Sequence, residues 1–316
     1  MMKNCIFGCS RLHWIYRNRL DRRQVSTLIS LSEVVVGEIY GRKVINNMEV
    51  HRNRRLRVAL QKELEQLEKQ EKRMEKKFSK QEPPEWKTAL EAKVPEKVRI
   101  NLEKAFCKAF SVVFQHGNSL IEKTYNKEEL QKDHEIQAYA VQIKGNRKEL
   151  RKMSKNAGAA DLRNMALTTV EGAGLGLLGI GIPDIVIFIG MLMKGVYEAA
   201  LHYGFDYDVP QERLLILKMM EASLSRGEER AHMNHEVDAM CVTLPTAEEA
   251  KNLLQEQIDR TAKAFAVDML LLKFIQGLPV VGVLGGAANP VYYRRIMKYV
   301  QLKYRKRYLI KKISEQ

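Results

Sequence analysis

The sequence predicts an all-α protein, and three observations support that fold class. Apolar residues recur every three, four or seven positions over long segments, which is the spacing of one helix face. Capping residues and prolines stand at the ends of these segments. No stretch of useful length alternates apolar and polar residues as a half-buried strand would. We therefore expect a helical bundle that includes two apolar helical hairpins rich in glycine and proline.

The first regular segment, residues 48–82, is predicted to be a charged amphipathic helix. Its apolar positions are Leu56, Leu60, Leu64, Leu67, Met74 and Phe78. Glu and Lys fill the other face, several of them in pairs four residues apart. Two interpretations stay open: the apolar stripe packs on the body of the protein, which we favour, or the helix pairs with a partner as a coiled coil. Pro83 and Pro84 end the helix.

The following helices are indicated by residues typical of helix ends. The signals are Pro95 and Pro210 in first turns, Gly117 and Gly204 as C-caps, Asp208 as an N-cap, and Thr246 with Glu249 as a capping box. The capping box is expected to open a long helix that ends near Gln276.

Two largely apolar segments are rich in glycine: residues 172–193, in which Asp184 is the one charged residue, and residues 274–290, which carry no charge. Glycine costs about 1 kcal/mol in a helix interior, so a run of it indicates close approach of helices. The residues expected to form this packing motif, or to cap it, are Gly172, Gly176, Pro183, Gly204, Pro279 and Gly282. Buried hairpins, shallow membrane insertion and full membrane spans all stay open. Asp184 favours burial, because a carboxylate costs roughly 2.5–3.5 kcal/mol at the bilayer centre.

The net charge of +15 is concentrated at the two ends of the chain. Residues 1–55 carry 11 basic and 4 acidic side chains, and residues 294–316 carry 9 basic and 1 acidic. The 238 residues between them hold 33 of each sign. We therefore expect electrostatic attraction to come from the ends, which argues against a basic groove spread over the whole fold.

The C-terminal helix gives the strongest sign of an interaction. Its apolar face is formed by Tyr293, Ile296, Met297, Val300, Tyr304 and Tyr308. The basic residues predicted to bind lipid or a partner are Arg294, Arg295, Lys298, Arg305, Lys306 and Lys312. Such a helix suits an anionic membrane surface, at about 1 kcal/mol per Lys or Arg near it. The alternative is an apolar face packed on the body with a basic face that is merely solvated. Nucleic acid is not expected as a partner, because no recognised motif accompanies the charge.

Candidate reactive groups are sparse. Asp184 opens an apolar helix, where it is expected to cap N–H groups, and with Glu171 and Glu198 it is the candidate for a catalytic carboxylate cluster. His232, His235 and Cys241 are weak metal-ligand candidates that lack the order of a zinc hydrolase motif. We expect no cofactor and no metal. Four irregularly spaced cysteines favour a reducing compartment.

These segments together resemble the EcsC protein family of bacteria over roughly residues 55–312. The resemblance lies in the Gly-x-Pro-Asp turn at 181–184, the helix end at 198–206 and the acidic, then apolar, helix start at 212–217. It continues in residues 277–282 with Asn289, and in the basic helix end at 304–307. The order and spacing of these motifs carry the resemblance.

The resemblance implies a membrane-linked bacterial context, since the family is named after a gene beside an ABC-type exporter, and it supplies no catalytic residues. We expect a non-enzymatic protein at the inner face of the cell membrane, bound to anionic lipid, a transporter component, or both. A hydrolase built around Asp184 is the alternative. Residues 1–47 are predicted to be a basic extension, natural or translated from upstream sequence, and residues 83–316 an EcsC-like helical domain.

Overall fold

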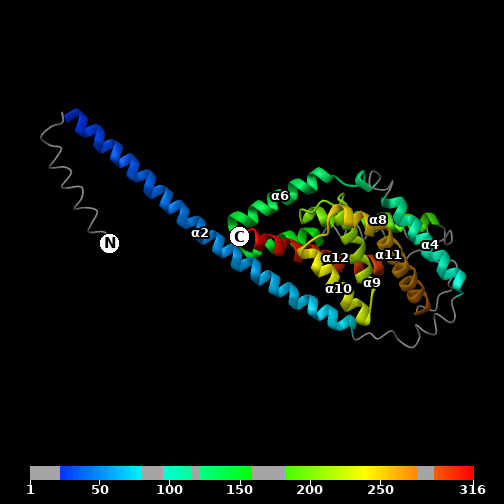
Figure 1. Cartoon of the computed structure of the whole chain (residues 1–316). Helices are drawn as coiled ribbons and strands as arrows, with labels where there is room; N and C mark the ends of the chain where they lie inside the picture. Colours follow the sequence, from blue (N-terminus) through cyan, green and yellow to red (C-terminus); the bar gives the residue numbers. More distant parts are fainter. Residues whose placement is uncertain (1–21, 80–94, 115–120, 159–181, 276–287) are drawn as a thin grey trace. The chain divides into compact units, whose positions relative to one another are not determined.

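The computed structural model describes residues 22–79, 95–114, 121–158, 182–275 and 288–316, and all of the regular structure in these ranges is helical. The chain divides into two compact units, Met1–Arg54 and Arg55–Gln316. The described part of the first unit is the beginning of one helix. The second unit is a helical bundle, which confirms the predicted all-α class (Figure 1).

The first long helix, α2, spans Arg22–Ser79. It begins 26 residues earlier than predicted, because residues 22–47 contain no proline that would interrupt it. The predicted boundary at residue 47 therefore falls inside the helix. In the second unit, α2 contributes Leu56, Leu60 and Leu67 to the core, as the favoured interpretation of its apolar stripe predicted.

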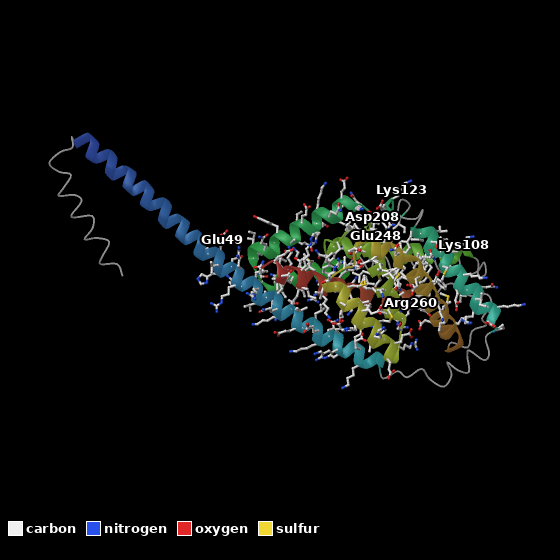
Figure 2. All side chains as sticks on the ribbon, viewed as in Figure 1. Glu49, Lys108, Lys123, Asp208, Glu248 and Arg260 are labelled. Atoms are coloured by element: carbon white, nitrogen blue, oxygen red, sulfur yellow. The ribbon has the colours of Figure 1, made fainter. Side chains whose placement is uncertain are left out.

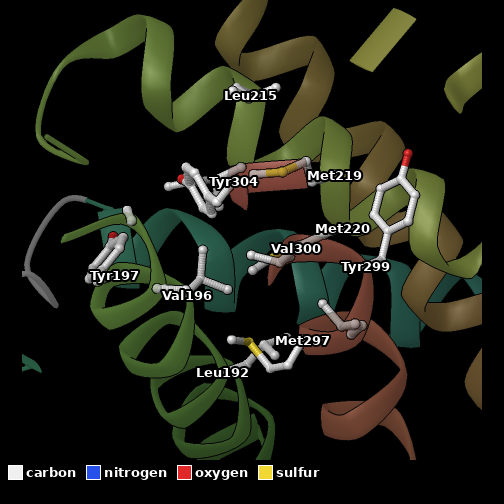
Figure 3. Packing of buried hydrophobic residues seen from close by; sticks show 14 of the residues in the cluster. Leu192, Val196, Tyr197, Leu215, Met219, Met220, Met297, Tyr299, Val300 and Tyr304 are labelled. Carbon is white, nitrogen blue, oxygen red and sulfur yellow. The ribbon is translucent and has the colours of Figure 1, made fainter. Parts of the chain in front are cut away.

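The remaining helices enclose a core built around α8, α9, α11 and α12. Their bounds are α4 Glu96–Val112, α6 Lys127–Lys144, α8 Ile182–His202, α9 Pro210–Leu224, α10 Gly227–Val242, α11 Ala247–Ile275 and α12 Ala288–Ser314. A further helix spans residues 147–158. Figure 3 shows side chains of α8, α9 and α12, among them Val196, Met219 and Val300, meeting in the interior, and all three are fully buried.

Most of the predicted helix ends are present in the structure. Thr246 and Glu249 form the predicted capping box: the Thr246 N–H donates to Glu249 Oε2 at 2.8 Å, and the Glu249 N–H donates to Thr246 Oγ1 at 3.3 Å. Pro210 opens α9, but Val209 is the N-cap. The prediction of Asp208 as the N-cap was wrong, because Val209 occupies that position, and the Asp208 carboxylate lies 2.6 Å from Lys127 Nζ.

Gly204 has the predicted left-handed conformation after α8, with φ 76°. A Cβ atom there would overlap the ring of His134 on α6. Pro183 lies in the first turn of α8, as its motif suggests. Gly172, Gly176, Pro279 and Gly282 lie outside the described residues. The proposed pairing of the two glycine-rich hairpins therefore stays a prediction.

α8 is the one helix in the described part of the chain that is long and apolar enough to cross a membrane. The qualifying window is Ile185–His202, and 72% of it is buried inside the bundle. Ile189, Leu192 and Val196 are fully buried. Gly195 also permits close approach of α12, because a Cβ atom there would overlap the hydroxyl of Tyr293.

Candidate functional site

Several basic residues of α12 point into the bundle. Lys303 is fully buried and donates to Glu71 of α2 and, at 2.6 Å, to Asp238 of α10. Lys306 lies 2.7 Å from the carboxylate of Glu71 and 2.9 Å from that of Asp238. Burying these charges is tolerated because each has an opposite charge within reach. The contacts tie α12 to the two helices beside it.

Two more cations of α12 are held by buried carboxylates. Arg307 Nη1 donates to both oxygens of Glu212, at 2.8 and 2.6 Å, and the Tyr304 hydroxyl donates to the same group at 2.9 Å. Burial raises the pKa of Glu212, and the charge of Arg307 opposes that rise. Arg295 Nη1 donates to both oxygens of Asp268 at 3.2 and 3.0 Å. These cations stabilise the interior.

The six α12 residues predicted to bind lipid or a partner therefore fall into two groups. Arg295, Arg305 and Lys306 contact buried carboxylates, and Lys312 pairs with Glu315 at 2.7 Å. The assumption of a solvated basic face does not hold for the first three, because α12 is covered on more than one side. Of the six, Arg294 and Lys298 are exposed and form no ion pair with the described residues.

A strongly basic surface lies instead on the helix of residues 147–158. Its buried side chains are Leu150, Met153 and Ala157. Its exposed basic side chains, which we call the outer face, are Lys148, Arg151, Lys152 and Lys155. Their spacing of three, four and seven residues places them together on the side opposite the core. Residues 144–155 hold six basic side chains against one acidic, so positive charge is concentrated at a central segment as well as at the chain ends.

An exposed apolar stripe lies on α6, directly before the outer face. Ile136, Tyr139 and Ile143 are 67%, 65% and 44% exposed, and their spacing puts them on one side of the helix. Only a short turn separates α6 from the next helix: Gly145 ends α6 with φ 54°, and Asn146 Oδ1 accepts the N–H of Glu149 at 3.1 Å. Elsewhere, single charged residues such as Lys108 on α4 are scattered over the bundle (Figure 2).

Three arginines converge on one carboxylate where this helix meets α2 and α12. Arg147 Nε and Arg151 Nε donate to Glu63 Oε1 at 2.6 and 3.0 Å, and Arg305 Nη2 donates to Oε2 at 2.5 Å. Gln66 Oε1 accepts from Nη2 of Arg147 and Arg151 at 2.6 and 3.0 Å. We call Arg147, Arg151 and Arg305 the arginine cluster. With Glu63 fully buried among them, the group has a formal charge of +2.

Two of the three predicted catalytic carboxylates, Asp184 and Glu198, are far apart in the sequence of α8. Asp184 and Glu198 both belong to this helix, and 14 residues correspond to about 21 Å along a helix axis. Glu198 is buried near the hydroxyl of Tyr125. The side chain of Asp184 and all of Glu171 lie outside the described residues. Asp184 and Glu198 therefore do not act on one bond together.

The weak metal-ligand candidates of α10 differ in burial. His232 and His235 are exposed, and His232 lies 3.2 Å from Glu236. Cys241 is buried, and burial raises the pKa of its thiol to about 12. Among the described residues, no group of three His, Cys, Asp or Glu side chains is placed to hold a metal ion.

The outer face and the arginine cluster were not among the sites predicted from the sequence. A signal for the outer face was present, because Lys148, Lys152 and Lys155 recur at helical spacing. A signal for buried ion pairs was also present, since Glu63 and Glu71 follow Leu60 and Leu67 at intervals of three and four along α2. The meeting of three arginines on Glu63 had no local signal, because they come from residues 84 to 242 positions away.

The fold and these contacts define an all-α bundle with a buried network of ion pairs and a basic outer face on residues 147–158. The model of the EcsC protein family matches residues 59–309, which include α6, the outer face and most of α12. The chain therefore belongs to the EcsC protein family, and the resemblance found in the sequence is confirmed. No curated protein and no solved structure matches the chain.

Proposed function

We propose that this EcsC-family protein is a non-enzymatic, membrane-peripheral protein that binds anionic lipid at the inner face of the cell membrane. The observation that carries the proposal is the outer face, with four exposed cations directly after the apolar stripe of α6. At about 1 kcal/mol per cation near an anionic surface, the three lysines, which unlike Arg151 are not paired with Glu63, contribute about 3 kcal/mol at low salt. That corresponds to an affinity gain on the order of 100-fold.

The apolar stripe supports a bilayer surface as the partner. Exposed Tyr139 and Ile143 are side chains that enter the headgroup region of a membrane, beside cations that bind the phosphates. Glu128, Asp133 and Glu135 occupy the first half of α6 and would be repelled. We therefore expect contact at the C-terminal half of the helix, next to the outer face.

The family context favours a transporter nearby. The EcsC resemblance implies an ABC-type exporter as neighbour, and a protein held on the inner leaflet by its outer face would lie beside such a transporter. Binding to the membrane and binding to a transporter component are compatible. The separation of Asp184 from Glu198 supports this function over a hydrolase.

Vesicle flotation tests the proposal. The full chain is expected to float with vesicles containing phosphatidylglycerol at low salt, and not with phosphatidylcholine vesicles or at 0.5 M salt. The triple variant Lys148→Gln, Lys152→Gln, Lys155→Gln, which we call the outer-face variant, is expected to bind about 100-fold more weakly.

A matched control distinguishes a specific surface from net charge. Lys97, Lys104 and Lys108 are three exposed lysines on α4. Their replacement by Gln removes the same charge, and we expect the affinity for vesicles to change less than threefold. Equal loss in both variants would contradict the proposed surface. Binding of duplex DNA at the affinity measured for vesicles would favour nucleic acid as the partner and would also contradict it.

A further inference from the structure

We propose that the arginine cluster is a binding site for a terminal phosphate group, either the phosphate monoester of a lipid headgroup or free inorganic phosphate. The site deepens the proposed function by naming the headgroup chemistry, and its lipid-bound form rests on that function. Binding of free phosphate does not depend on it.

The charges of the cluster are incompletely balanced. Glu63 supplies one negative charge to Arg147, Arg151 and Arg305, which together carry three positive charges. Gln66 adds an acceptor oxygen without a charge. Glu149, the acidic residue on the same helix as Arg147, is itself paired with Lys144 at 3.0 Å. The excess of +2 matches a phosphate monoester, which carries about −1.5 to −2 near pH 7.

The geometry leaves donors available to a ligand. Each guanidinium has five N–H groups. Among the described residues, Arg147 and Arg151 donate through Nε and Nη2, and Arg305 donates through Nη2. The Nη1 groups of all three therefore have no recorded acceptor.

Solvent can reach these side chains to different degrees. Arg151, Arg147 and Arg305 are 54%, 36% and 20% exposed. The site thus has an open side at Arg151 and a closed side at Arg305, against Glu63. Planar guanidinium groups bind phosphate through paired hydrogen bonds. Glu63 and Gln66 hold the guanidinium groups of Arg147 and Arg151 in place before a ligand binds.

Titration with inorganic phosphate tests the site without a membrane. Isothermal calorimetry at pH 7.5, with chloride at matched ionic strength as the reference, is expected to show saturable binding to the full chain. The double variant Arg147→Gln, Arg151→Gln is expected to bind at least tenfold more weakly. No saturable binding to the wild type would overturn the proposal.

A second double variant controls for charge. Lys104→Gln with Lys108→Gln removes two positive charges from exposed positions of α4 without touching the cluster or the outer face, and we expect less than a threefold change. Equal weakening by the two double variants would overturn the proposal, because the attraction would then be unspecific. If the arginine double variant fails to fold by circular dichroism, Arg151→Lys replaces it. That change keeps the charge and removes the planar fork, so affinity should fall about fivefold, and unchanged affinity would overturn the site.

Vesicles distinguish the two sources of phosphate. With phosphatidic acid and phosphatidylglycerol vesicles adjusted to equal surface potential, a lipid-binding site predicts at least fivefold preference for phosphatidic acid, lost in Arg147→Gln, Arg151→Gln. Phosphate binding without that preference assigns the site to free phosphate. Flotation on phosphatidylglycerol without any phosphate binding would overturn this inference and leave the proposed function standing. Phosphate binding without flotation on any vesicle would overturn the proposed membrane function and leave the phosphate site standing.

Discussion

α12 and the helix of residues 147–158 are both rich in positive charge, yet they place it differently. Among the described residues, six of the nine basic side chains in 294–316 make ion pairs, and Lys303 is fully buried. On the shorter helix, Lys148, Lys152 and Lys155 are exposed and face away from the core. Charge that points inward holds α12 to its neighbours, and charge that points outward is available to a partner. The comparison predicts loss of stability from changes in one helix and loss of binding from changes in the other.

The largest effect on stability is expected from Lys303→Met. The change keeps the length of the side chain but leaves Asp238 and Glu71 with one cation fewer in a buried setting. Removing one partner of a buried ion pair costs about 3 kcal/mol or more. Denaturant unfolding measures this, with Lys298→Met as the control on an exposed position of the same helix, where we expect about 0.5 kcal/mol or less. Equal losses of unfolding free energy in the two variants would contradict the conclusion that Lys303 is buried and paired.

A smaller loss of stability is expected where α12 approaches α8. Gly195→Ala places a methyl group against the buried hydroxyl of Tyr293, and such overpacking costs about 1–3 kcal/mol. Gly190→Ala on the same helix is the matched control, since a Cβ atom there meets no atom within 4 Å. That change should leave stability unchanged or raise it by up to about 1 kcal/mol. Thermal unfolding of both variants is the measurement, and a stabilised Gly195→Ala would show that α12 does not pack as described.

Arg294 and Lys298 sharpen the comparison, because they are two of the three basic residues of α12 that are exposed without an ion pair in the described structure; Lys311 is the third. Gln301, less than one turn after Lys298, donates to the carbonyl of Ala157 at 3.4 Å, which places the helix of the outer face nearby. We expect Arg294→Gln with Lys298→Gln to weaken vesicle binding about tenfold, less than the outer-face variant does. If this double variant lost more affinity for vesicles than the outer-face variant does, the membrane-binding surface would have to lie on α12 and the outer face would not be the main contact.

The smallest effect concerns the thiol of Cys241, which lies near the inward lysines of α12. Burial raises its pKa to about 12, and burial together with Asp259 raises that of Cys107 to about 12. In a background with Cys5→Ser and Cys9→Ser, neither thiol should react with iodoacetamide at pH 8 unless the protein unfolds. Because the folded pKa exceeds the unfolded value of about 8.5, the free energy of unfolding should fall as pH rises from 8.5 toward 12. Rapid labelling of the native chain at pH 8 would contradict this.

The sequence was sufficient to predict the fold class, the family and most helix ends. Thr246 with Glu249, Gly204 and Pro210 behave as their local chemistry predicts, because a cap depends on residues within one turn. Asp208 was an exception, since its carboxylate pairs with Lys127, far along the chain. Local rules therefore failed where a distant charge competes with the cap.

The charged contacts were harder to predict. A helical wheel of α12 places Lys303 and Arg307 at the edge of its apolar face, which suggests buried partners, but it does not show that α2 covers the side that carries Arg305 and Lys306. Net charge summed over the 238 central residues also hid the basic cluster at 144–155, because acidic residues elsewhere cancel it. The arginine cluster requires the tertiary fold, since α2, residues 147–158 and α12 each supply part of it.

The central claim is that outward charge binds the membrane while inward charge stabilises the fold. One paired measurement tests it most directly: partition constants on phosphatidylglycerol vesicles and unfolding free energies for the outer-face variant and for Lys303→Met, the latter under conditions where it remains folded. For the outer-face variant we predict about 100-fold weaker partitioning with little change in the free energy of unfolding. For Lys303→Met we predict a large loss of unfolding free energy with little change in partitioning. Unchanged partitioning of the outer-face variant, or partitioning of Lys303→Met reduced as strongly, would contradict the claim.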